Sequence, residues 1–216
     1  MNSLLLFLVS LMVGLSFLML MQTRVINLVK LLVIQNFILT AYIFCKALLY
    51  PTSEMYLSIT ITLVIKVIIL PWALWKLAKY LKLTLHIEPL INKSTLQFIG
   101  ILLVILSLLL SHQIESTIGE KIIVTFSLAL ANSMLALLLI IFRRKSISQI
   151  IGLLVLENSI FLLSATLTTG LPWLVELGMG FDVLIGFMIF SLFLLRIHAT
   201  YGSLNLSYLE KLKERI

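Results

Sequence analysis

The sequence has very little charge. Only 12% of its 216 residues are Asp, Glu, Lys or Arg, whereas 61% are hydrophobic and the mean hydropathy is +1.17. Soluble domains carry about 25% charged residues, so this composition excludes a soluble enzyme and leaves no stretch for a separate soluble catalytic domain. We therefore predict a membrane protein.

Cysteine and histidine are scarce as well. Cys45 is the single cysteine, which excludes an intramolecular disulfide and any cage of cysteine ligands for zinc or an iron–sulfur cluster. His86, His112 and His198 lie near the ends of apolar segments and have no metal-ligand spacing. We expect no metal site and no cofactor in this chain.

Long apolar runs fill the sequence instead, and each is long enough to cross a hydrocarbon core of about 30 Å. The first run follows no basic segment and precedes no small-residue cleavage site, so we interpret it as a retained helix rather than a signal peptide. The predicted fold is an all-α integral membrane protein with seven transmembrane helices. These cover residues 3–22, 26–49, 55–79, 95–112, 119–142, 147–169 and 171–196.

Basic residues are distributed unevenly between the two ends of these helices. With the N-terminus outside, 13 of the 16 Lys and Arg residues fall on the cytoplasmic side, Lys46 and Lys121 fall outside, and Lys66 stays in the membrane. Because cytoplasmic loops are rich in Lys and Arg, we predict an outer N-terminus and a cytoplasmic C-terminus. The net charge of +7 then reflects orientation rather than nucleic-acid binding.

We expect a single transmembrane domain, residues 1–216. Residues 1–94 would hold three helices and a cytoplasmic linker, residues 95–118 the fourth helix and an outer loop, and residues 119–216 a three-helix unit with a short cytoplasmic tail. The fourth helix has few polar residues, so we expect it to face lipid or a partner. The fifth helix holds small polar residues of the kind that usually bond across helices. They are Thr125, Ser127, Asn132 and Ser133.

Two carboxylates lie in the middle of the last two predicted helices. Glu157 is 13 residues and Asp182 is 12 residues from a turn at Gly170, which places both about 18–20 Å from that end. An ionisable group at the bilayer centre costs about 2.5 kcal/mol or more, so each is a candidate functional residue. The structural alternative is a neutral acid hydrogen-bonded inside the bundle.

A lysine, Lys66, lies in the third predicted helix and shares a face with Ser58 and Thr62 at four-residue spacing. Pro71 removes a backbone hydrogen bond, which predicts a kink near the lysine. At this depth Lys66 needs a carboxylate, a water-filled cavity or deprotonation. Periodicity does not decide whether it pairs with Glu157 or Asp182, and a static ion pair is the structural alternative.

Further features surround Asp182. Gly178 and Gly186 lie four residues to either side of it, on the same helix face, and would let another backbone approach closely. Glu176 lies nearer the outer end. It is a candidate for an outer proton exit, with an interfacial acid as the alternative.

Several motifs, in this order and spacing, resemble component E, the membrane subunit of hydrogenase-4-type formate hydrogenlyase complexes. The resemblance covers the whole chain, and Ser159 stands where that family is expected to carry glycine. The motifs are Ile61 to Pro71 with its Lys66, Arg144 to Gly152, Leu156-Glu157-Asn158, Val175 to Gly178, Asp182, Arg196-Ile197-His198 and Gly202 to Asn205.

The last three helices are also similar to the small K subunit of respiratory complex I and to the C subunit of Mrp-type cation/proton antiporters. In that comparison Glu157 falls on the first intramembrane glutamate of the K subunit. Asp182 falls on the second, with aspartate in place of glutamate. The 25 residues between them are fewer than in the complex I subunit.

The resemblance implies a membrane-arm subunit of an energy-converting oxidoreductase in the cytoplasmic membrane of a bacterium or archaeon. Its partners would be antiporter-like subunits, the membrane anchor of the redox arm, and lipid. The chain would not be catalytic by itself, because it has no ligands for nickel, iron or flavin, and those cofactors would belong to partner subunits. Its substrate would be H⁺ or Na⁺ alone.

From these residues we hypothesise that Glu157 and Asp182 exchange protons at the midplane while Lys66 acts on them electrostatically. Two alternatives remain open at this stage: a purely structural bridging subunit of the same complex, and a component of an Mrp-type antiporter. A free-standing carrier is disfavoured, since the sequence has neither an inverted repeat nor a pair of broken helices.

Overall fold

A computed structural model describes residues 2–49, 51, 56, 59–60, 62–80, 90–118, 120–143 and 146–167, and the single positions 186, 188, 192 and 196. These residues form helices and no strand, which confirms the predicted all-α class. The helices are α1 (Asn2–Met21), α2 (Val25–Leu49), the π-helical stretch η1 (Leu63–Ile69), α4 (Leu70–Tyr80), α5 (Lys93–Ile118), α6 (Glu120–Ile141) and α7 (Ser146–Leu167).

Five of the described helices are long and apolar enough to cross a membrane. They correspond to the first, second, fourth, fifth and sixth predicted segments. The third predicted segment, residues 55–79, is divided between η1 and α4. The seventh, residues 171–196, lies outside the described residues except at the single positions 186, 188, 192 and 196.

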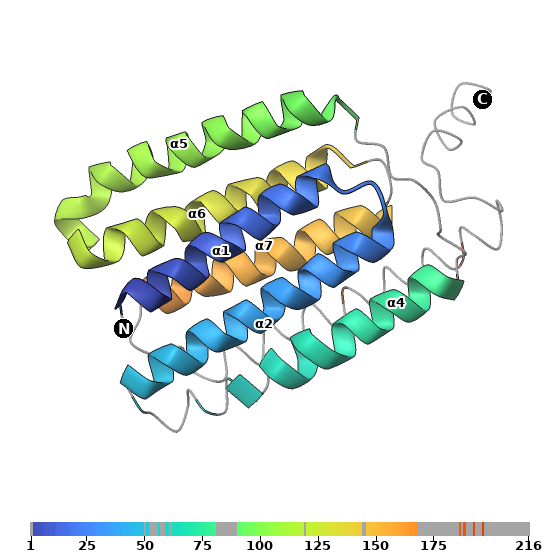
Figure 1. Ribbon diagram of the computed structural model, residues 1–216, viewed down its shortest axis with the longest axis horizontal. Helices are drawn as coiled ribbons and strands as arrows, with labels where there is room; N and C mark the ends of the chain where they lie inside the picture. Colours follow the sequence, from blue (N-terminus) through green and yellow to red (C-terminus); the bar gives the residue numbers. More distant parts are fainter. Residues whose placement is uncertain are drawn as a thin grey trace.

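Four of the helices, α1, α2, α6 and α7, form the centre of the bundle (Figure 1). In this group α6 contacts α1 and α7, and α2 contacts the same two helices. Helix α5 packs outside α6 and α1, whereas η1 and α4 pack against α2 at the opposite edge (Figure 1). This arrangement brings η1 beside the central helices despite its distance from α7 along the chain.

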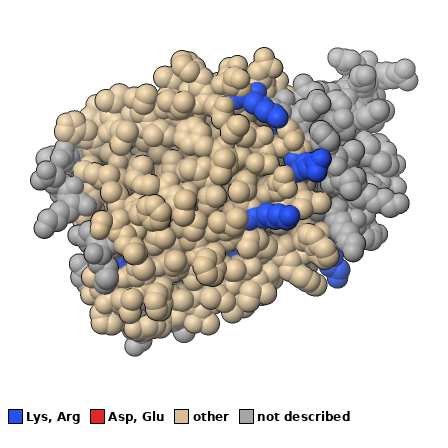
Figure 2. All heavy atoms as spheres, viewed as in Figure 1, with Lys and Arg blue, Asp and Glu red and all other residues tan. Residues whose placement is uncertain are grey.

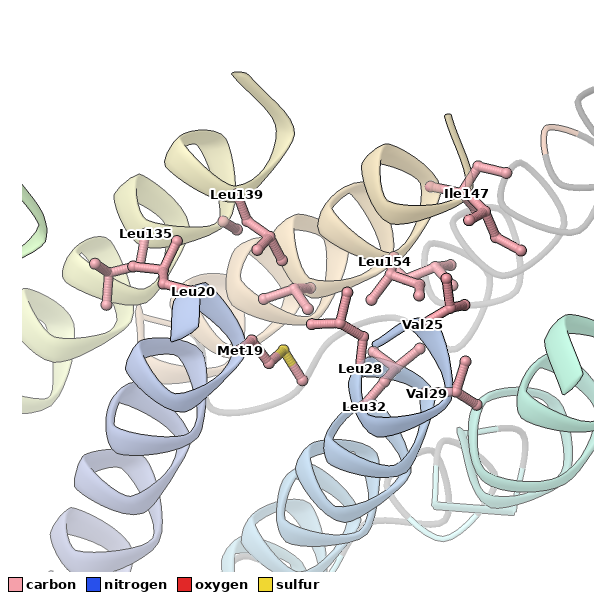
Figure 3. Packing of buried hydrophobic residues seen from close by; sticks show 14 of the residues in the cluster. Met19, Leu20, Val25, Leu28, Val29, Leu32, Leu135, Leu139, Ile147 and Leu154 are labelled. Atoms are coloured by element: carbon pink, nitrogen blue, oxygen red, sulfur yellow. The ribbon is translucent and has the colours of Figure 1, made fainter. Parts of the chain in front are cut away.

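Two apolar clusters fill the interior. One lies where α1 ends and α2 begins, and Figure 3 shows Met19, Leu28 and Leu32 facing Leu139 and Leu154 there. The other is built from residues nearer the opposite ends of the same helices, among them Met12, Leu39, Ala129 and Leu162. On α2, α6 and α7 the buried residues of the two clusters are separated by polar residues, which belong to the site described below.

Large apolar side chains are exposed along the described helices. Helix α5 exposes large hydrophobic side chains such as Phe98, Ile101 and Leu109, as expected for a helix that faces lipid or a partner. The face in Figure 2 is almost uncharged, and its Lys and Arg side chains gather toward the end where α1 ends and α2 begins. This is the end that the charge pattern predicts to be cytoplasmic.

The helix before Pro71 has a wider turn than the sequence predicted. The Leu70 N–H donates to the carbonyl of Ile65, five residues earlier, so residues Leu63–Ile69 form a π-helix with Lys66 at its middle. Such stretches are rare and arise where a helix carries an extra residue or lacks a donor. Pro71 supplies that cause, because it has no N–H to donate.

Candidate functional site

The candidate site is a buried ion pair between Lys66 of η1 and Glu157 of α7. The Lys66 ammonium lies 2.8 Å from Glu157 Oε1, and the two side chains are only 7% and 10% exposed. Glu157 lies near the middle of α7, about 15 Å from either end at a rise of roughly 1.5 Å per residue. Of the two possible partners left open by the sequence, Glu157 is therefore a direct partner of Lys66.

An aromatic ring also contacts the lysine. Phe161 lies one helical turn after Glu157 on α7, and its ring centroid is 5.2 Å from the Lys66 ammonium. A cation at this distance from a ring is stabilised electrostatically, more strongly when water is absent. Together Glu157 and Phe161 place the positive charge against one face of α7.

Two asparagines complete the surroundings of Lys66. Asn158 of α7 lies next to Glu157, and its Oδ1 is 3.4 Å from the ammonium. The Asn158 amide donates to Asn36 Oδ1 at 2.5 Å, and the Asn36 amide donates to the backbone carbonyl of Lys66, also at 2.5 Å. Both asparagines are almost fully buried. Helices α2, α7 and η1 therefore meet at one hydrogen-bonded group.

A second hydrogen-bonded chain continues this layer across the bundle. Gln35 donates to Ser16 at 3.1 Å, Ser16 donates to Asn132 at 2.5 Å, and Asn132 donates to Ser159 at 2.7 Å. It meets the Lys66 group at two places, because Gln35 precedes Asn36 on α2 and Ser159 follows Asn158 on α7. The polar layer thus connects α1, α2, α6, α7 and η1 between the two apolar clusters.

The chemistry of the two parts of this layer differs. A carboxylate can take up and release a proton near neutral pH when its surroundings are tuned, and an ammonium beside it governs that exchange. Amides and hydroxyls donate and accept hydrogen bonds but do not change charge in that range. Lys66 and Glu157 can therefore take part in proton transfer, whereas the amide and serine groups hold the geometry. No group of three possible metal ligands (His, Cys, Asp or Glu) occurs within the described ranges.

Sequence reasoning identified part of this layer. It singled out Lys66 and Glu157, and it predicted that Asn132 bonds across helices, which the structure confirms. Ser127 and Ser133, grouped with Asn132, bond instead to carbonyls of their own helix. It missed Ser16, Gln35 and Asn36, although the signal was available, since each is a polar residue within a long apolar helix.

Two other cations, the buried Arg143 and the half-buried Lys46, cap helix ends. Arg143, just after α6, is 1% exposed and donates to the carbonyls of Met19, Leu20 and Gln22 at the end of α1, at 2.7–3.0 Å. Burial lowers the pKa of Arg143 to about 10, so it stays charged at neutral pH and interacts favourably with the negative end of the α1 dipole. Lys46, near the end of α2, donates to the Ala165 carbonyl of α7.

Two of the predicted site residues, Asp182 and Glu176, lie outside the described residues. Gly186, predicted to allow close approach of another backbone beside Asp182, is described. A Cβ placed on it would meet no atom within 4 Å, so in the part of the chain that the structure covers the close approach is not made there.

The chain is similar to several known proteins. No family model matches it, and no solved structure matches it. It is 22% identical over 179 residues to hydrogenase-4 component E of Escherichia coli strain K12, covering 83% of each chain, and equally similar to the protein of that name from Shigella flexneri. It is also 26% identical over 153 residues, 70% of each chain, to the uncharacterised protein Rv0085 of Mycobacterium tuberculosis. Similarity over most of its length thus supports the hydrogenase-4 component E assignment that the motifs predicted.

Proposed function

We propose that this chain is a membrane-arm subunit of a hydrogenase-type complex and that Lys66 and Glu157 form one segment of its proton path. The observation that carries the proposal is the ion pair itself, buried inside the bundle between two apolar clusters. The similarity to hydrogenase-4 component E supports the setting, a complex of several subunits.

The direct contact between the two charges supports proton transfer. An ammonium at 2.8 Å favours the ionised carboxylate, so moving the ammonium away or hydrating the site would favour uptake of a proton. The attraction between the two charges weakens as their distance grows, so displacement of the ammonium shifts the carboxylate toward the neutral acid. The pair is therefore a proton-binding group whose occupancy is set by the position of Lys66.

The remaining parts of the proposal come from the sequence. Asp182 is the second carboxylate of the path, and Glu176 is the outer exit. The chain crosses the cytoplasmic membrane seven times, with its N-terminus outside and its C-terminus in the cytoplasm. Antiporter-like subunits and the membrane anchor of the redox arm are its partners, and the transported ion is H⁺ or Na⁺.

A structural role is the second candidate, and the amide contacts favour it. Asn36 binds the carbonyl of Lys66, and Asn158 binds its ammonium. These contacts are expected if the ion pair serves to join η1 to α2 and α7. In that case the chain bridges its partner subunits, and Glu157 keeps its charge throughout the catalytic cycle.

The test begins with a tagged full chain purified from the native membrane, which should bring hydrogenase-type partners with it. The variant Glu157→Gln should then reduce the number of protons translocated per redox turnover by at least about tenfold, because the amide cannot hold a transferable proton. Proton release and hydrogen evolution are measured in the same vesicles, and repeating the assay with and without Na⁺ identifies the ion.

Glu157→Asp is the matched control, because it keeps the carboxylate and should retain pumping. Asp182→Asn is tested in the same way. If Glu157→Gln lowers only the yield of intact complex, with unchanged protons per turnover, then the structural role is correct. Purification without partners, or unchanged pumping in both variants, contradicts the proton path.

A further inference from the structure

The carbonyl of Lys66 has lost its donor within the helix. In η1 the Leu70 N–H donates to Ile65, five residues earlier, rather than to Lys66. In the same register the Lys66 carbonyl would accept the N–H of residue 71, but residue 71 is proline and has none. A buried carbonyl without a donor is unfavourable, so another group must satisfy it.

Asn36 of α2 supplies the missing donor. Its amide lies 2.5 Å from the Lys66 carbonyl oxygen, and the residue is 2% exposed. The other end of the same amide accepts from Asn158, whose oxygen in turn lies 3.4 Å from the Lys66 ammonium. Two amides therefore join the backbone carbonyl of Lys66 to its own side-chain charge in a closed ring.

We infer that Asn36 and Pro71 act together as a positioning device. Pro71 leaves the Lys66 carbonyl without a donor, and Asn36 binds that carbonyl. This hydrogen bond fixes the register of η1 and therefore the position of the Lys66 ammonium beside Glu157. Asn36 is a positioning residue, because it acts on Glu157 only through Lys66 and Asn158. The consequence for pumping rests on the proposed function, whereas the geometry can be tested without it.

The device matters because helix register controls the direction of a side chain. A change of one residue in register rotates a side chain by about 100° around the helix axis. If Asn36 did not bind the carbonyl, the turn around Lys66 would relax toward another register. The ammonium would then leave Glu157, and a buried carboxyl without its counter-charge favours the neutral acid.

Reaction with a hydrophobic carbodiimide, which modifies neutral buried carboxylic acids and not ion-paired carboxylates, tests this inference. The full chain in native membranes is labelled, and modification of Glu157 is followed by mass spectrometry. Asn36→Leu keeps the size of the side chain and removes both the donor to the Lys66 carbonyl and the acceptor for Asn158. It should speed the labelling of Glu157 by at least about fivefold, the factor that loss of one buried hydrogen bond corresponds to.

The second variant restores the donor from within the helix. Pro71→Ala returns an N–H to residue 71, so Glu157 in the double variant Asn36→Leu, Pro71→Ala should be labelled at a rate within about twofold of wild type. If the two substitutions acted independently, their separate effects on the labelling rate would multiply instead. Asn27→Leu is the matched control, because Asn27 lies on the same helix and its side chain donates to Gln22, away from the Lys66 group. It should not change the labelling of Glu157 in either background.

Equal labelling of Asn36→Leu and wild type overturns the inference, and so does a failure of Pro71→Ala to reverse the effect. If Asn36→Leu alone does not accumulate, recovery of the protein by Pro71→Ala supports the inference, and no recovery overturns it. Labelling that follows the expectation while Glu157→Gln still pumps normally would keep the positioning device and contradict the proton path.

Discussion

Lys66 and Glu157 are each unfavourable alone in the interior of this bundle and are tolerated together. Each charge is desolvated by the surrounding helices, and each is compensated by the other at 2.8 Å. Asn158 and the ring of Phe161 also contact the ammonium, and Asn36 binds the backbone carbonyl of Lys66. At the scale of residues, the chain should therefore be stable with both charges present or with both removed, and less stable with only one of them.

The paired substitutions should show this dependence. Lys66→Met leaves Glu157 without its counter-charge, and Glu157→Met does the same to Lys66, so each should lower the free energy of unfolding by about 3–5 kcal/mol. The double variant should be close to wild type or more stable, because an apolar pair of similar volume carries no desolvation penalty. Unfolding of the full chain by sodium dodecyl sulfate in mixed micelles measures all four proteins. A double variant as unstable as the sum of the two single variants would contradict this account.

At the scale of elements, a small residue allows two helices to approach closely, and a capping side chain joins the end of one helix to another. Gly152 of α7 lies against α6, where a Cβ would be 2.8 Å from Ile140 Cγ1 and 3.2 Å from the Ile140 backbone nitrogen. Arg143 closes the end of α1 with three hydrogen bonds to carbonyls. These contacts hold α6 and α7 at the spacing that brings Asn132 to Ser159.

Two glycine substitutions with opposite outcomes test the helix contact. Gly152→Ala should lower the free energy of unfolding by about 1–3 kcal/mol, because the added methyl cannot fit without moving α6. Gly14→Ala on α1 should raise it by about 0.5–1 kcal/mol, since its Cβ would meet nothing within 4 Å and alanine favours the helix. The same micelle unfolding assay applies. Equal effects of the two substitutions would show that α6 and α7 are not in close contact at Gly152.

At the scale of the whole molecule, contacts between helix ends show in which direction the helices run relative to one another. Arg143 after α6 reaches the end of α1, and Lys46 near the end of α2 reaches the end of α7. Helices α1 and α6 therefore run in one direction, and α2 and α7 run in the other. This alternation is what the distribution of basic residues predicts for successive crossings.

Cysteine labelling in intact cells tests the predicted orientation just outside the two ends of the fourth predicted segment, residues 95–112. In a Cys45→Ser background, Gln113→Cys should react with a membrane-impermeant maleimide from outside, because that end has few basic residues. Ser94→Cys should react only after permeabilisation. Both positions are exposed, so access of the reagent depends on the membrane. The reverse pattern would place the N-terminus in the cytoplasm.

The sequence by itself determined the class of the protein and the two charges at its site. Composition and the length of apolar runs are local properties, and they predict membrane-spanning helices without any knowledge of packing. Lys66 and Glu157 could be recognised for the same reason, because a charge inside an apolar run is visible in one segment. The π-helical turn at Lys66 was only partly predicted: Pro71 indicated a break, but not its form.

Tertiary structure alone decided which residues meet. Asn36, Lys66 and Asn158 come from segments that are 30 and 92 residues apart along the chain, and helical periodicity does not say which helix faces which. Their contacts depend on the packing of α2, α7 and η1, which is settled by the fit of side chains between helices. For that reason the carbonyl freed by Pro71 and its donor on α2 became recognisable as one device only when the helices were assembled.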